Sequence, residues 1–123
     1  MKFNLDPPVP VNVVRAHGPG MIRIGDRKLA SSVIVTPRAL IEPWRPRSMA
    51  DLVAADLDPV LELQPEVLLI GTGARQVFPG TALIAELYAL RLGFEIMDTA
   101  AACRTYNVLV AEGRDVAAAL IVE

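Results

Sequence analysis

The chain has 123 residues, of which 53% are hydrophobic and 21% charged, a composition that can bury a core and argues against a disordered chain. Its net charge of −2 argues against nucleic-acid binding, and its single cysteine excludes an intramolecular disulfide and a cysteine-based metal cluster. Because the sequence shows no signal-peptide pattern and no run of about 18 apolar residues, we expect a cytoplasmic protein without a transmembrane segment. We also expect no metal or cofactor.

The first half of the chain predicts β-structure. Residues 1–10 are rich in proline and are expected to form a flexible tail before a single domain over residues 11–123. Strand-like segments follow at residues 11–16, 21–24, 28–36 and 39–41, with turn signals at 17–20 and 25–26. The first 45 residues therefore predict a layer of antiparallel hairpins.

The second half alternates between helices and strands. Ser48 is a plausible cap for a helix near residues 51–55, and Asp58-Pro59 repeats the signal of a cap residue followed by proline. Then come a buried strand at 67–70, a helix at 81–92, a strand at 94–97, a helix at 100–112 and a strand or helix at 116–122. This alternation favours an α/β fold with parallel strands in a βαβαβ order and helices on the sheet faces.

The loops after Ile70 and Met97 form a candidate ligand crevice. Right-handed crossovers place both loops at one sheet edge, where open α/β sheets bind ligands. Two arginines beside a helix N-terminus would suit a small anion; the alternative is structural, with Arg75 paired to Asp98 and Arg104 to Glu95 or Asp98. The candidate crevice residues are Thr72, Gly73, Arg75, Gln76, Asp98, Thr99, Arg104, Thr105 and Asn107.

The other chemical motifs are weak. Gly71-Thr72-Gly73 has Gln76 where a dinucleotide-binding fingerprint needs a third glycine, so tight turning at the strand end is the better interpretation. Cys103 has no base near it in the sequence and predicts a packed thiol in the core, while His17 alone cannot build a metal site. We therefore assign no catalytic residue.

A candidate interface lies in the arginine-rich first half. Residues 1–50 carry eight positive and three negative charges, whereas residues 51–123 carry four arginines and eleven acids. Trp44 and Arg45 stand between Pro43 and Pro46, and Arg47 follows; Trp and Arg dominate the energetics of protein interfaces. The alternative for Trp44 is that it folds back and covers the core. For the charges, the alternative is a solvated surface.

Two motifs resemble those of a known family. VLLIGTGARQVFPG at residues 67–80 and MDTAAACRTYNVLVAEGR at residues 97–114, with the strand after them, are similar to the signatures of the MTH-domain family, and the likeness spans residues 14–122. This family of small proteins of unknown function includes a mitochondrial assembly factor for respiratory complex I and the adipogenesis-associated MTH-domain protein. The resemblance implies a three-layer α/β domain with a central mixed sheet and a β layer from the N-terminal half.

The leading functional hypothesis is a non-enzymatic interaction or assembly module with a protein partner. It rests on the lack of a catalytic constellation, the arginine-rich half, Trp44 and the family resemblance. The alternative is a small-anion or small-molecule binding protein or enzyme that uses Arg75, Thr99 and Arg104 in the crevice.

Overall fold

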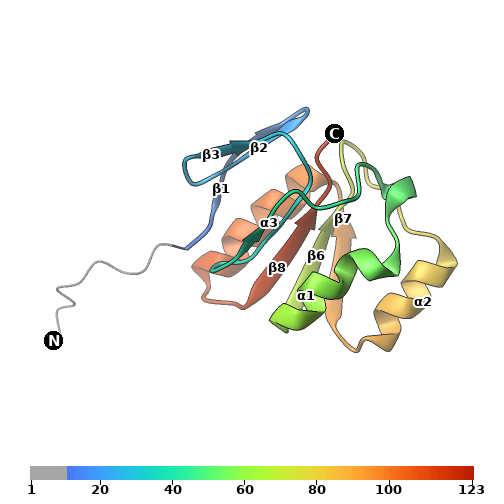
Figure 1. The fold of residues 1–123 in the computed structure, drawn as a ribbon. Coiled ribbons are helices and arrows are strands. Elements are labelled where there is room, and N and C mark those ends of the chain that lie inside the picture. Colours follow the sequence, from blue (N-terminus) through green and yellow to red (C-terminus); the bar gives the residue numbers. More distant parts are fainter. Residues whose placement is uncertain (1–10) are drawn as a thin grey trace, which may run out of the picture.

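A mixed sheet forms the centre of the computed structural model, which describes residues 11–123 (Figure 1). The expected flexible tail, residues 1–10, lies outside the described part. The first half contains β1 (Val14–Gly18), β2 (Met21–Ile24), β3 (Arg27–Leu29), β4 (Val33–Val35), β5 (Leu40–Ile41) and the 3-10 helices η1 (Met49–Asp51) and η2 (Ala54–Leu57). The second half contains α1 (Asp58–Leu63), β6 (Val67–Gly71), α2 (Thr81–Ala89), β7 (Gly93–Met97), α3 (Thr99–Ala111) and β8 (Val116–Leu120). Within residues 11–123, no helix is both long and apolar enough to cross a membrane.

The central sheet has five strands in the order β5-β4-β8-β6-β7. The strands β8 and β7 run parallel to β6 on either side of it, while β4 pairs antiparallel with β8 and with β5. A strand with neighbours on both edges and apolar side chains throughout is covered on both faces. The prediction that residues 67–70 form a central strand is therefore confirmed.

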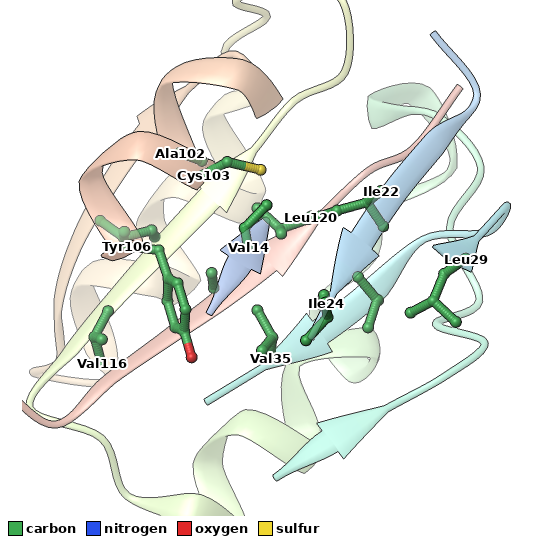
Figure 2. Packing of buried hydrophobic residues seen from close by; sticks show 13 residues of the cluster. Val14, Ile22, Ile24, Leu29, Val35, Ala102, Cys103, Tyr106, Val116 and Leu120 are labelled. Atoms are coloured by element: carbon green, nitrogen blue, oxygen red, sulfur yellow. The ribbon is translucent and has the colours of Figure 1, made fainter. Parts of the chain in front are cut away.

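Two apolar layers cover the two faces of this sheet. Alternation along β8 shows the division, because Val116, Ala118 and Leu120 join one core cluster and Ala117 and Ala119 the other. On the first face lie α3 and a separate antiparallel sheet, β1-β2-β3, whose apolar side chains meet Cys103 and Tyr106 (Figure 2). On the second face lie η1, η2, α1 and α2 (Figure 1). The expected three-layer α/β fold with a mixed sheet and an N-terminal β layer is confirmed.

The antiparallel layer is smaller than predicted. Residues 28–36 do not form one strand: β3 pairs with β2 in the small sheet, whereas β4 pairs with β8 in the central one. Between them the chain crosses from one sheet to the other. Ser32 fixes this crossing, since its hydroxyl oxygen accepts a hydrogen bond from Val122 N (3.1 Å) and its carbonyl accepts one from Trp44 N (2.8 Å).

The predicted helix near residues 51–55 is also wrong. Two 3-10 helices, η1 and η2, flank an extended Leu52-Val53 segment. In a continuous α-helix, Val53 N would donate to the carbonyl four residues earlier. Here it donates instead to the side chain of Asp56, at Oδ2 (2.9 Å). The α-helix begins only at Asp58, with Pro59 in its first turn. Asp58 is therefore the first helical residue and not the cap that the sequence predicted; the cap position is Leu57.

Candidate functional site

The carboxyl ends of β6, β7 and β8 meet at one edge of the central sheet. Gly71, the last residue of β6, is in register with Met97 and with Leu120. Beyond the strands, Thr72 N donates to Met97 O (2.8 Å) and Thr99 N donates to Gly73 O (2.9 Å). The loops after β6 and β7 are therefore bonded directly to each other, as the crossover argument predicted.

Thr99 is the residue that joins the three strand ends. Its hydroxyl accepts a hydrogen bond from Gly73 N (2.8 Å) and donates one to Ile121 O (2.6 Å). The first turn of α3 is thus tied to the loop after β6 and to the segment after β8. One threonine side chain at a helix start adds to the backbone bonds Thr72 N to Met97 O and Ile121 N to Gly71 O, which also join this edge.

The glycines of Gly71-Thr72-Gly73 are explained by close approach. A Cβ atom on Gly71 would lie 3.0 Å from Thr99 Oγ1 and 3.1 Å from Thr99 Cα. Gly73 has a φ of +100°, which L residues rarely adopt, and a Cβ there would overlap the carboxylate of Glu123. These glycines let α3 and the end of the chain pack against β6, in agreement with the tight-turn interpretation.

Most other predicted crevice side chains make contacts within the fold. Thr72 is buried and its hydroxyl donates to Arg75 O (2.5 Å) and accepts from Val77 N (3.1 Å), which folds the loop onto itself. Asp98 caps α3 by accepting a hydrogen bond from Ala101 N (2.8 Å). The remaining contacts are Gln76 Nε2 to Ile96 O (3.1 Å), Thr105 Oγ1 to Met97 Sδ (3.5 Å), and Asn107 paired with Val14 N and O (2.9 and 2.8 Å).

A pocket of about 220 Å³ opens at this edge, between the sheet and the β1–β2 turn. Gly73 and Thr99 line it, but Arg75 and Arg104 do not. The two titratable side chains that line the pocket are His17 and Glu123, and the sequence predicted neither of them at this site. His17 lies in β1, where the sequence predicted a turn, and Glu123 is the last residue of the chain, so no local sequence pattern links the two places.

The two arginines do not form the predicted ion pairs. Arg75 and Arg104 are exposed, and neither is paired with Asp98 or with any other carboxylate among residues 11–123. The structural alternative of Arg75–Asp98 and Arg104–Glu95 or Arg104–Asp98 pairing is wrong. The reason is that Asp98 faces its own helix N-terminus, where it satisfies a free amide.

Cys103 lies inside the core between α3 and the two sheets (Figure 2). Burial raises the pKa of its thiol to about 12, with a smaller opposing effect of Arg104. A thiol that stays protonated at neutral pH is a poor nucleophile. The prediction of a buried, packed cysteine is confirmed. Within residues 11–123, no three His, Cys, Asp or Glu side chains are grouped to hold a metal ion.

Trp44 packs into the core instead of standing out as an anchor. Its side chain is only 5% exposed, and Nε1 donates to Asp56 O (2.9 Å). Arg45 makes a two-pronged contact with Asp56, from Nε to Oδ1 and from Nη2 to Oδ2 (both 2.7 Å), which lowers the pKa of Asp56. Of the two alternatives for Trp44, the structure shows the one in which it covers the core. Arg47 remains exposed.

Comparison with known sequences adds a family and two relatives. The family model for a protein of unknown function, DUF498/DUF598, matches residues 14–121. A protein of Danio rerio named NADH dehydrogenase (ubiquinone) 1 alpha subcomplex assembly factor 3 is 34% identical over 111 residues, which are 89% of this chain and 63% of that protein. The "13 kDa major membrane protein" of Francisella tularensis is 38% identical over 65 residues, 53% of each chain. The chain thus spans less than two thirds of the length of both relatives.

Solved structures are similar over nearly the whole chain. A crystal structure from Bordetella parapertussis has a TM-score of 0.85 and 39% identity, covering 95% of this chain and 100% of the other. A solution structure from Bordetella pertussis, described as a Mth938-like domain, has a TM-score of 0.77 and 34% identity, covering 98% and 92%. Both relationships extend over the two sheets and the helices described above.

Proposed function

We propose, on the premise that this chain belongs to the DUF498/DUF598 family of proteins of unknown function, that it is a non-enzymatic interaction module that assists the assembly of a protein complex in the cytoplasm. The observation that carries this proposal is the relationship to the assembly factor of Danio rerio, which extends over 89% of this chain. Since that relative is longer, its whole activity and its partners enter only as part of the proposal.

The chemistry of the candidate crevice supports a binding role more than catalysis. Thr72, Thr99 and Asp98 make hydrogen bonds within the fold, and Cys103 is buried with a raised pKa. Catalytic groups need to reach a substrate. Side chains bonded in this way instead give rigid surfaces, which suits a module that is recognised by a partner.

Gene deletion in the native cell tests the proposal. The first complex to examine is the respiratory NADH dehydrogenase, because the relative is named for it. We expect less of the assembled enzyme on native gels, accumulation of partial assemblies, and recovery when the wild-type gene is returned. An unchanged amount of assembled enzyme would overturn the assembly role.

Fractionation of the same cells tests the location of the protein. Recovery with membranes, as the name of the Francisella relative suggests, would overturn the cytoplasmic location.

A second candidate function is small-anion binding at the sheet edge. It is favoured by one observation, that Asp98 caps α3 and leaves Arg75 and Arg104 without a carboxylate partner among residues 11–123. Phosphate titration at millimolar concentration, followed by backbone amide shifts, tests it. Shifts confined to residues 72–76 and 99–105, and lost in Arg104→Ala, would support the anion site; their absence would leave the interaction module alone.

A further inference from the structure

The helix α2 is apolar on almost every side, yet it is largely exposed. Its sequence, TALIAELYA, contains one charged residue, Glu86, and only Leu87 is buried. Tyr88 is 71% exposed, and Phe78, just before the helix, is 68% exposed. A helix without a polar face is normally covered by protein. Within residues 11–123 the fold supplies cover for one side of α2 only.

One flank of α2 borders a groove formed with η2 and α1, and the helix contributes Leu83, Glu86, Leu87 and Leu90 to it, whereas Tyr88 and Phe78 lie outside it. This groove has a volume of about 190 Å³ and an apolar floor that includes Leu57 and Leu87, both buried. Leu61 and Leu90, 37% and 38% exposed, line it as well. Figure 1 shows the two helical walls on the same face of the central sheet. The groove therefore offers a strip of apolar surface between two helical walls. The backbone groups of these walls are already hydrogen-bonded within their own helices.

The charge of the groove has one sign. Asp58 lines it on the α1 side and Glu86 on the α2 side, and among residues 11–123 no cation lines it. An apolar strip with carboxylates on both walls is complementary to a partner that presents apolar side chains flanked by cations. A groove between helices accepts side chains at helical spacing, whereas strand addition requires an open sheet edge.

We propose that the groove between η2–α1 and α2 binds an amphipathic helix of a partner protein, with an apolar stripe inserted along Leu57, Leu61, Leu87 and Leu90 and with Lys or Arg residues facing Asp58 and Glu86. This proposal rests on the proposed function, since it states the chemistry of the partner that the assembly module receives. A few residues in well-packed, desolvated pockets near the centre of an interface carry most of its binding energy, so the partner side chains that fill the groove should dominate the affinity.

The direct test uses the full chain and a synthetic peptide of leucine and lysine, about 14 residues or roughly four turns long, with leucines at positions i, i+3, i+4 and i+7. The comparison peptides carry glutamate in place of lysine, or the same residues in scrambled order. We expect amide shifts within residues 54–61 and 83–90, and binding at least about tenfold tighter for the lysine peptide than for either comparison peptide. Equal binding of the three peptides, or shifts elsewhere on the molecule, would overturn the proposal.

Matched variants locate the site. Leu90→Asp should weaken binding of the lysine peptide by at least about tenfold, while Val108→Asp, at an exposed apolar position on α3, should leave it unchanged. Both positions are exposed, so both variants should fold. Asp58→Asn with Glu86→Gln should weaken binding and flatten its salt dependence, whereas Glu112→Gln, at the residue that follows α3, should change neither. Equal losses in a groove variant and its control would overturn the proposal.

Two other occupants would give distinct results. If a second copy fills the groove, the free chain will dimerise with rising concentration and Leu90→Asp will abolish the dimer. If residues 1–10 fill it, their deletion will sharply increase peptide affinity; either result would overturn the proposal.

Failure of the groove proposal can be distinguished from failure of the assembly role. Normal complex assembly in cells carrying Leu90→Asp would reject the groove alone, and peptide binding without a deletion phenotype would reject the assembly role alone.

Discussion

Thr99 Oγ1 lies 2.8 Å from the amide nitrogen of Gly73 and 2.6 Å from the carbonyl oxygen of Ile121, so a single hydroxyl links the start of α3 to the segments that follow β6 and β8. The candidate crevice is built around this contact. The first two predictions follow from it.

Replacing Thr99 by Val should destabilise the fold. The substitution keeps the shape of the side chain but leaves Gly73 N and Ile121 O without this partner, at a cost of about 1–3 kcal/mol in the free energy of unfolding. Urea denaturation measures this change. Thr105→Val is the matched control, since the Thr105 hydroxyl makes only a 3.5 Å contact with Met97 Sδ. Equal effects in the two variants would show that the Thr99 contacts contribute nothing particular.

Gly73→Ala should destabilise the chain by about 1–3 kcal/mol, because an L residue is strained at positive φ. The φ of Gly73 is +100°, and an added Cβ would also displace the Glu123 carboxylate. Gly93→Ala serves as the control: an added Cβ there meets only Glu66 O, at 3.7 Å, so we expect a much smaller change. Thermal unfolding of both variants decides the matter, and a fully stable Gly73→Ala protein would contradict the role given to this glycine.

Leu69→Ala should cost about 2–5 kcal/mol of stability, because it leaves a cavity in the middle of the central sheet. Leu69 lies on β6 and is 1% exposed, within the cluster shared by α3 and the small sheet. Leu63→Ala, at an exposed position at the end of α1, should cost less than about 1 kcal/mol. Chemical denaturation of both variants measures the two losses of stability. Equal losses would contradict the central place of β6 in the fold.

The stability of the protein should fall as pH rises above about 8.5, the ordinary pKa of a thiol in an unfolded chain. Burial raises the pKa of folded Cys103 to about 12, so the folded chain holds this proton more tightly than the unfolded chain does. The stability that this difference in the pKa of Cys103 supports is complete below the pKa of the unfolded chain, and it is lost as the pH rises toward the pKa of the folded chain. Tyr106, whose pKa is also raised by burial, adds a similar loss at higher pH.

The Cys103→Ala variant separates the two groups, because it keeps the Tyr106 effect and removes that of the thiol. We expect the free energy of unfolding of this variant to decline less than that of the wild type between about pH 8.5 and pH 10, the range between the ordinary pKa values of thiol and phenol. A thiol-specific reagent at neutral pH should label the native wild-type chain slowly. Fast labelling would contradict the buried, protonated thiol.

The sequence determined the second half of the fold and the family. Alternating helix and strand patterns located β6, α2, β7 and α3 within a few residues, because glycines and cap residues mark their ends and because both faces of β6 are apolar. Residues 116–122 are compatible with a strand or a helix, and pairing with β4 and β6 makes them the strand β8. The resemblance of residues 67–80 and 97–114 to the MTH-domain family is confirmed by the DUF498/DUF598 match and by the Mth938-like structure. The meeting of the two loops at one edge followed from crossover handedness alone.

Tertiary structure decided what local patterns leave open. Apolar β-branched residues at 28–36 are compatible with one long strand, and only pairing with β2 on one side and β8 on the other divides them between two sheets. Trp44 and Asp98 have side chains that suit either a surface role or an internal bond, and the choice depends on neighbours distant in sequence or on the exact helix start. His17 and Glu123 share a pocket only because the hairpin and the end of β8 pack at the same edge. Local sequence encodes the elements, whereas long-range pairing, which no local pattern contains, assembles the site.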